Sequence, residues 1–119
     1  MPPLVTIYHN PRCSKSRETL SLLESRGIEP RVILYLETPP DAATIKTLLT
    51  QLGMRSAREL MRVKEDIYNE LNLKNTSLDE EALIVAMVTH PKLIERPIVV
   101  TDAGARIGRP PENVLEIVA

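Results

Sequence analysis

The feature that most constrains this chain lies near its start, where an apolar run passes through the only cysteine into a helical pattern. β-branched and aromatic residues alternate over 5–8, Asn10-Pro11 ends the predicted strand, and Ser14 is a residue type that caps helices. The pattern therefore predicts that Cys13 lies at or just before the N-terminus of a helix, at the end of a strand.

A thiol at that position should be unusually acidic. The unpaired N–H groups and the positive end of the helix dipole stabilise an anion there. Arg12, Lys15 and Arg17, together with His9 when it is protonated, would add positive charge. Because the reference pKa of a free thiol is about 8.5, we expect a lowered pKa and a Cys13 that is nucleophilic near neutral pH.

Strand and helix patterns alternate in the first third of the chain. A helix is predicted over 16–26, and the nearly continuous apolar run over 31–36 is typical of a strand buried on both faces of a parallel sheet. Strand, helix and strand form a βαβ unit, which places Cys13 at the C-terminal end of the first strand, where open α/β sheets have their sites.

The sheet pattern then stops for about half the chain and resumes near the C-terminus. Helical patterns occupy 41–53, 57–61, 66–71 and 79–90, followed by a predicted hairpin of strands over 96–101 and 105–108 and a last helix that begins near Pro110. The predicted fold is α/β: a thioredoxin-like mixed four-stranded sheet flanked by helices, with a helical insertion at about 41–95 between strands 2 and 3.

Composition limits the class of protein. With 119 residues, 43% of them hydrophobic, the chain fits a single domain over 1–119. Its 15 Lys and Arg residues against 16 Asp and Glu give a net charge of -1, which argues against a nucleic-acid partner. Met1-Pro2-Pro3 shows no charged leader and no apolar run approaches the roughly 18 residues of a membrane span, so we expect a soluble cytoplasmic protein.

The cysteine count limits the chemistry. One cysteine forms no internal disulfide, and two histidines do not suggest a zinc cluster, so we expect no metal and no tightly bound cofactor. Thiol redox chemistry in this chain must recruit a second thiol from outside. Because position 16 is Ser16 rather than a second cysteine, a dithiol mechanism is excluded.

Three residues near the predicted helix start are candidates for the chemistry. Cys13 is the candidate nucleophile; the alternative is a small buried hydrophobic residue. The Ser16 hydroxyl, or the N–H groups around it, could donate hydrogen bonds to the thiolate, although Ser16 could equally be an ordinary residue of a first helical turn. His9 could help to deprotonate the thiol, or could simply hydrogen-bond at the strand end.

Three arginines are candidates for binding an oxyanion, because a guanidinium is a planar, permanently charged group that binds oxygens in pairs. They are Arg62, Arg96 and Arg109, and nothing in the predicted order of strands brings them to Cys13. The alternative for each is a solvated surface residue. Cysteine-based phosphatases use a Cys-x5-Arg loop, and Thr19 at the corresponding position argues against a phosphatase.

Four ordered motifs resemble the glutaredoxin-coupled arsenate reductase family, in its short chromosomal branch: 7–17, 35–40, 90–100 and 106–112. The resemblance implies a thioredoxin-like fold with a helical insertion and a cis peptide at Arg96-Pro97. It also implies that Cys13 attacks arsenate, that His9 and Ser16 favour the thiolate, and that the three arginines named above bind the oxyanion.

The implied reaction consumes external thiols. Cys13 forms a covalent adduct with arsenate, glutathione attacks it, arsenic passes from the pentavalent to the trivalent state, and glutaredoxin resolves the mixed disulfide and releases arsenite. Two alternatives stay open: a glutathione-dependent thiol-disulfide transferase, and a non-catalytic adaptor that binds RNA polymerase. The adaptor family's redox switch uses Cys-x-x-Cys, which this chain lacks.

Overall fold

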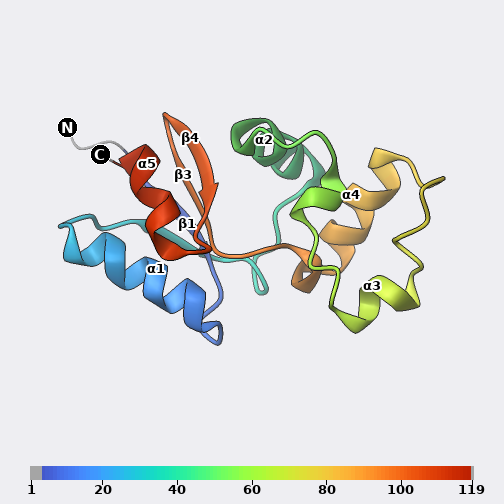
Figure 1. Cartoon of the computed structure of the whole chain (residues 1–119), viewed down its shortest axis with the longest axis horizontal. Coiled ribbons are helices and arrows are strands. Elements are labelled where there is room, and N and C mark those ends of the chain that lie inside the picture. The colour runs from blue at the N-terminus through green and yellow to red at the C-terminus, as the bar shows by residue number, and fades with distance from the viewer. Residues whose placement is uncertain (1–3, 119) are drawn as a thin grey trace. The chain divides into compact units, whose positions relative to one another are not determined.

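The computed structural model describes residues 4–118, which form two compact units. Unit 1 comprises 4–38 together with 96–118, and unit 2 is Pro39–Glu95. The predicted helical insertion of about 41–95 therefore coincides with unit 2, and each unit is described by itself (Figure 1). The single-domain organisation over 1–119 stays a prediction.

Unit 1 is built on a four-stranded sheet in the order β2-β1-β3-β4. The strands are β1 (Thr6–His9), β2 (Arg31–Leu34), β3 (Ile98–Thr101) and β4 (Gly104–Ile107). β1 pairs in parallel with β2 and antiparallel with β3, and β3 pairs antiparallel with β4. The mixed four-stranded sheet, the βαβ unit and the C-terminal hairpin are confirmed.

One expectation about the sheet is wrong. The apolar run at 31–36 is not a strand buried on both faces: β2 ends at Leu34, and Val32 is 43% exposed. The reason is its place in the sheet, because β2 is an edge strand with a neighbour on one side only. An apolar run of this length is common to central and edge strands, so the sequence pattern did not distinguish them.

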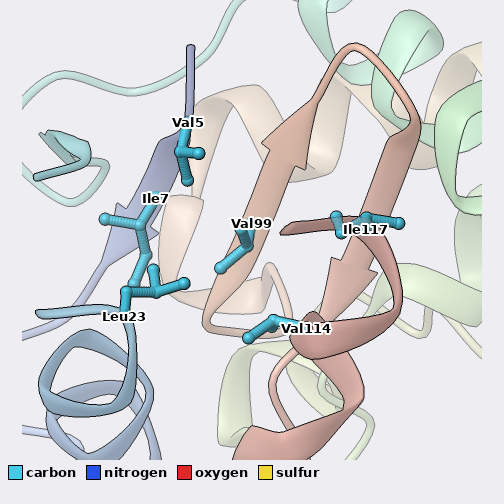
Figure 2. Close-up of a cluster of buried hydrophobic side chains, with 6 residues drawn as sticks. All are labelled: Val5, Ile7, Leu23, Val99, Val114 and Ile117. Carbon is cyan, nitrogen blue, oxygen red and sulfur yellow. The ribbon is translucent and has the colours of Figure 1, made fainter. Parts of the chain in front are cut away.

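The core of unit 1 lies on one face of this sheet, under α1 (Ser14–Ser25) and the C-terminal η3 (Pro111–Val114) and α5 (Leu115–Val118). Ile7 of β1 and Val99 of β3 are directly opposite each other in the register and share this face. Figure 2 shows the buried cluster they form with the helical side chains: Val5, Ile7, Leu23, Val99, Val114 and Ile117. Burying one such side chain stabilises a fold by roughly 1.5–3 kcal/mol.

The helix after the cysteine begins at Ser14, two residues before its predicted start at 16. The N-cap is Cys13, with extended backbone angles, and Ser14 is already helical and exposed, so the predicted cap at Ser14 is wrong. The helix ends before Gly27, whose φ of +76° suits a glycine. The buried side chains of α1 are Ser16, Thr19 and Leu23, which follow one another at helical spacing along a single face.

Unit 2 is helical, as predicted. Its elements are α2 (Ala42–Leu52), η1 (Ala57–Leu60), α3 (Asp66–Glu70), α4 (Glu80–Thr89) and η2 (Pro91–Leu93). The caps follow the sequence signals: Asp41 accepts from the Thr44 N–H at 2.8 Å, and Ser56 with Glu59 forms a capping box on η1. The unit has fully buried side chains of its own, which include Ile45, Leu48, Leu60, Leu83, Met87 and Leu93. Within 4–118, no helix combines the length and apolar character that crossing a bilayer requires.

Candidate active site

Cys13 lies in unit 1 where the loop after β1 enters α1. Asn10 shapes this loop: its carbonyl accepts from the Cys13 N–H at 3.0 Å, and its side-chain Oδ1 accepts from the Arg12 N–H at 3.0 Å. Such a turn is what asparagine favours after a strand. As N-cap, Cys13 also accepts the first helical hydrogen bond, from the Arg17 N–H at 3.0 Å. The thiol is therefore at the positive end of a twelve-residue helix, as predicted.

Opposing influences act on the thiol, and the net effect is a lowered pKa. Burial raises the pKa of Cys13, which is only 9% exposed. The backbone N–H groups of Ser16 and Lys15 and the positive charges of Arg96 and Arg109 lower it, and together they outweigh burial. The pKa of Cys13 therefore lies below its ordinary value, so the thiolate is more populated near neutral pH than in a free cysteine.

Two of the three predicted arginines are at this thiol. Arg109 Nη2 lies 3.6 Å from Cys13 Sγ and donates to it, while its Nε donates to the Arg96 carbonyl at 2.9 Å. The β3–β4 hairpin explains the pairing. Since Ile98 is opposite Ile107 in the register, the residues just outside these two positions, 96 and 109, emerge at the same end of the hairpin.

Both arginines precede cis peptide bonds. The bond at Arg96-Pro97 is cis, as the resemblance implied. The bond at Arg109-Pro110 is also cis, which the sequence analysis did not predict.

The basic side chains close to Cys13 in sequence were expected to lower its pKa through their charges, but they are not the charges that do so. The Arg17 guanidinium donates to the Pro11 carbonyl at 2.9 Å, and the Lys15 ammonium forms an exposed ion pair with Glu18 at 3.3 Å. Lys15 does lower the pKa of Cys13, but through its backbone N–H. The side-chain charges that stabilise the thiolate come instead from residues 96 and 109, more than eighty positions away along the chain.

His9 and Ser16 form a buried pair beside the cysteine. His9 Nδ1 and Ser16 Oγ are 2.6 Å apart, and Ser16 Oγ also accepts from the Asn10 N–H at 3.0 Å. Burial, and to a lesser extent the charge of Arg17, lower the pKa of His9 from 6.5. A neutral His9 at neutral pH favours the hydrogen-bonding role over the cationic one. Ser16 accordingly forms a hydrogen bond with His9 through its hydroxyl, and its backbone N–H donates to the thiolate.

Arg62, the third predicted arginine, belongs to unit 2. Its N–H donates to the Leu93 carbonyl at 2.7 Å, and its guanidinium pairs with Glu65 at 2.7 Å. Both contacts are internal to unit 2, so its assigned role in binding the oxyanion stays a prediction from the resemblance.

Two residues that contact the framework of the site, Thr19 and Gly108, had no predicted role in it. Thr19 is fully buried on α1 and its hydroxyl lies 3.3 Å from the carbonyl of Gly108, the residue before Arg109. A signal existed in the sequence: Thr19 falls three positions after Ser16 and four before Leu23, on the helix face that packs inward. No sequence pattern paired it with Gly108.

A cavity of about 280 Å³ opens beside the loop that precedes the cysteine. Its lining residues come from the end of β1, the loop, and the segment after β2: His9, Asn10, Pro11, Arg12, Leu34, Leu36 and Glu37. His9 lines this cavity, whereas Cys13 is not among its lining residues.

The chain is similar to known proteins over nearly its whole length. The model of the ArsC family matches residues 8–117. An uncharacterized protein of Escherichia coli strain K12, YfgD, is 73% identical over 114 residues, which cover 96% of each chain. A protein named arsenate reductase from Neisseria meningitidis serogroup A is 54% identical over 112 residues, with 94% of this chain and 96% of the relative covered.

The fold is also that of solved structures. A structure described as an arsenate reductase from Vibrio cholerae superposes with a TM-score of 0.96 at 59% identity, and the match covers 98% of this chain and 99% of the other. The thioredoxin-like arrangement expected from the order of elements is thus confirmed.

Proposed function

The chain belongs to the ArsC family, and from this premise we propose that it is an arsenate reductase whose nucleophile is Cys13. The observation that carries the proposal is the contact of 3.6 Å between Arg109 Nη2 and the sulfur, combined with the lowered pKa of Cys13. A thiolate with a guanidinium beside it suits attack on a tetrahedral oxyanion, because the cation attracts the substrate to the nucleophile.

In the first proposed step, the Cys13 thiolate attacks arsenic. A sulfur–arsenic bond forms, and one arsenate oxygen takes up protons and leaves as water. Arg96 and Arg109 neutralise the charge on the remaining oxygens, which is electrostatic stabilisation of the transition state. The resemblance adds Arg62 as a further oxyanion ligand.

In the second proposed step, the thiolate of glutathione attacks the Cys13 sulfur. A disulfide bond forms, the sulfur–arsenic bond breaks, and its electron pair stays on arsenic, which is thereby reduced to the trivalent state. Glutaredoxin then resolves the mixed disulfide and regenerates the thiol. The single cysteine supports this scheme, because the chain holds no second thiol to complete the reduction.

The two buried polar residues beside the thiol have supporting roles in this proposal. Ser16 stabilises the thiolate through its N–H, and His9 holds the Ser16 side chain, and with it the first turn of α1, in place. We place the protein in the cytoplasm, since glutathione and glutaredoxin are kept reduced there.

The experiment that tests the function couples turnover to NADPH oxidation, with glutathione, glutathione reductase, glutaredoxin and arsenate. Native protein should oxidise NADPH in an arsenate-dependent manner, and Cys13→Ser should abolish this. With glutaredoxin and arsenate both left out, NADPH oxidation that a small disulfide drives and that Cys13→Ser abolishes would instead indicate the thiol-disulfide transferase. Absence of arsenate-dependent oxidation in the native protein would contradict the proposal.

A further inference from the structure

We propose that Gly108 and Thr19 are positioning residues that hold Arg109 against the Cys13 sulfur. Only the expected effect of these residues on arsenate turnover rests on the proposed function. Its geometric content, the placement of a guanidinium at a thiol, stands whatever the substrate is.

Space, rather than backbone conformation, requires glycine at position 108. Gly108 is buried and does not have a positive φ. A Cβ placed on it would lie 2.9 Å from Thr19 Cγ2 and 2.9 Å from Pro97 Cγ, and closer still to Thr19 Oγ1. Carbon atoms in proteins pack at about 3.5–4.0 Å, so an added methyl would force these segments apart.

Polar groups of Gly108 also lie close to the same two neighbours. Its N–H donates to the Pro97 carbonyl at 3.0 Å, and its carbonyl lies 3.3 Å from Thr19 Oγ1. The Thr19 hydroxyl also donates to the Lys15 carbonyl at 2.8 Å. Since one hydroxyl has one proton, the shorter bond to Lys15 dominates, and close packing is the stronger link between Thr19 and Gly108.

These contacts join the three segments that build the site. Gly108 directly precedes Arg109, Pro97 directly follows Arg96, and Thr19 belongs to the helix that begins at Cys13. A displacement at position 108 is therefore passed to the adjacent arginine, because a close-packed interior transmits strain rather than absorbing it. The distance from Arg109 Nη2 to the sulfur should be the first to lengthen.

The test is the pH dependence of Cys13 alkylation by iodoacetamide in Gly108→Ala. The midpoint should rise by roughly half a pH unit, a fraction of the 1–3 units by which an adjacent opposite charge typically shifts a pKa. Arg109→Ala sets the upper limit of the rise. A Gly108→Ala midpoint equal to that of the native protein, beside a raised midpoint in Arg109→Ala, would overturn the proposal.

The matched control is Gly27→Ala in the same unit. Gly27 has a positive φ but open space around it, so alanine there strains the backbone and lowers the melting temperature without moving the alkylation midpoint. In the proposed reaction, kcat/KM for arsenate should fall in Gly108→Ala and not in Gly27→Ala. If the native protein does not turn over arsenate, the proposed function is refuted but the positioning role is not. The alkylation midpoints would still measure how Arg109 is placed against the Cys13 sulfur.

A second-site variant tests the pairing itself. Thr19→Ala removes both Thr19 atoms that crowd position 108, so Thr19→Ala/Gly108→Ala should have a midpoint nearer the native value than Gly108→Ala alone. If the double variant has the same raised midpoint as Gly108→Ala alone, Thr19 does not hold Gly108 in place. If Gly108→Ala does not fold, Thr19→Ile keeps the branch at Cβ, adds bulk against Gly108 and should raise the midpoint in the same direction; a native midpoint in Thr19→Ile would contradict the proposal.

Discussion

At the scale of the residue, burial and polar contacts act in opposite directions on one sulfur, that of Cys13. Burial raises the pKa of Cys13, while two backbone N–H groups and two arginines lower it by more. A group whose pKa is lower in the folded state binds fewer protons there than in the unfolded state. The thiolate therefore contributes to stability above the unfolded pKa, and this contribution is lost as the pH falls through the folded pKa.

The first prediction follows from that linkage. The free energy of unfolding of the native protein, measured relative to Cys13→Ser, should increase as the pH rises toward the ordinary thiol pKa of about 8.5. Urea unfolding at a series of pH values measures this difference directly. A difference that stays constant, or that decreases with rising pH, would mean that the thiolate is not favoured by the fold.

The second prediction concerns the two arginines at the thiol. Arg96→Ala and Arg109→Ala should each raise the midpoint of Cys13 alkylation, because each removes a charge that favours the thiolate. Each should also lower kcat/KM for arsenate by about a hundredfold to a thousandfold, the usual cost of losing one oxyanion contact. Arg106→Ala is the control, since its exposed guanidinium pairs with Glu116 at 3.6 Å. Equal turnover in Arg96→Ala and native protein would refute the assignment.

The third prediction separates the two polar groups of Ser16. Ser16→Ala keeps the backbone N–H that stabilises the thiolate but removes the hydroxyl that bonds His9 and Asn10. The free energy of unfolding should fall by roughly 1–3 kcal/mol, which is the cost of leaving buried polar groups without partners. The midpoint of Cys13 alkylation should change little. A rise in the midpoint as large as that of Arg109→Ala would show that the hydroxyl itself acts on the sulfur.

At the scale of the element, the β3–β4 hairpin shows what sequence patterns can and cannot predict. Alternation and turn residues predicted both strands, and the strand–helix junction placed Cys13. The register that brings residues 96 and 109 together depends on pairing between strands, which no local pattern encodes. For the same reason the apolar run at 31–36 did not reveal that β2 is an edge strand, and burial on both faces was expected instead.

The fourth prediction tests an element contact in unit 2. Glu80, at the start of α4, accepts from the Ala57 N–H at 2.6 Å and from the Ser56 hydroxyl at 2.9 Å, and so ties α4 to η1. Glu80→Ala should lower the free energy of unfolding by about 1 kcal/mol. The neighbouring Glu81→Ala is the control: it removes only an exposed ion pair with Lys46 and should cost less than about 0.5 kcal/mol. Equal effects would contradict the structural role of Glu80.

At the scale of the whole molecule, the candidate site residues are divided unequally between the two units. Cys13, His9, Ser16, Arg96 and Arg109 all belong to unit 1, so the groups that set the acidity of the thiol are within one compact body. The strand–helix junction was enough to select Cys13 as the candidate nucleophile, because a helix start is a local feature. The family resemblance was needed to select the arginines, because their approach to the sulfur depends on the tertiary fold.

The fifth prediction uses this division. Arg62 belongs to unit 2 and is not among the groups that lower the pKa of Cys13. If the resemblance assigns it correctly, Arg62→Ala should raise the KM for arsenate and leave the alkylation midpoint at its native value. Native kinetics in this variant would remove Arg62 from the oxyanion ligands, and a raised midpoint would show that it acts on the thiol.

The most direct test of the central claim is the intact mass of the protein after anaerobic incubation with glutathione and arsenate, without glutaredoxin. The cycle should stop at the mixed disulfide, so the mass should increase by one glutathione per chain, and trivalent arsenic should form in equal amount. Phosphate in place of arsenate should give neither product, because thiols do not reduce it. Glutathione addition that is as extensive with phosphate, or absent with arsenate, would contradict an arsenate-attacking Cys13.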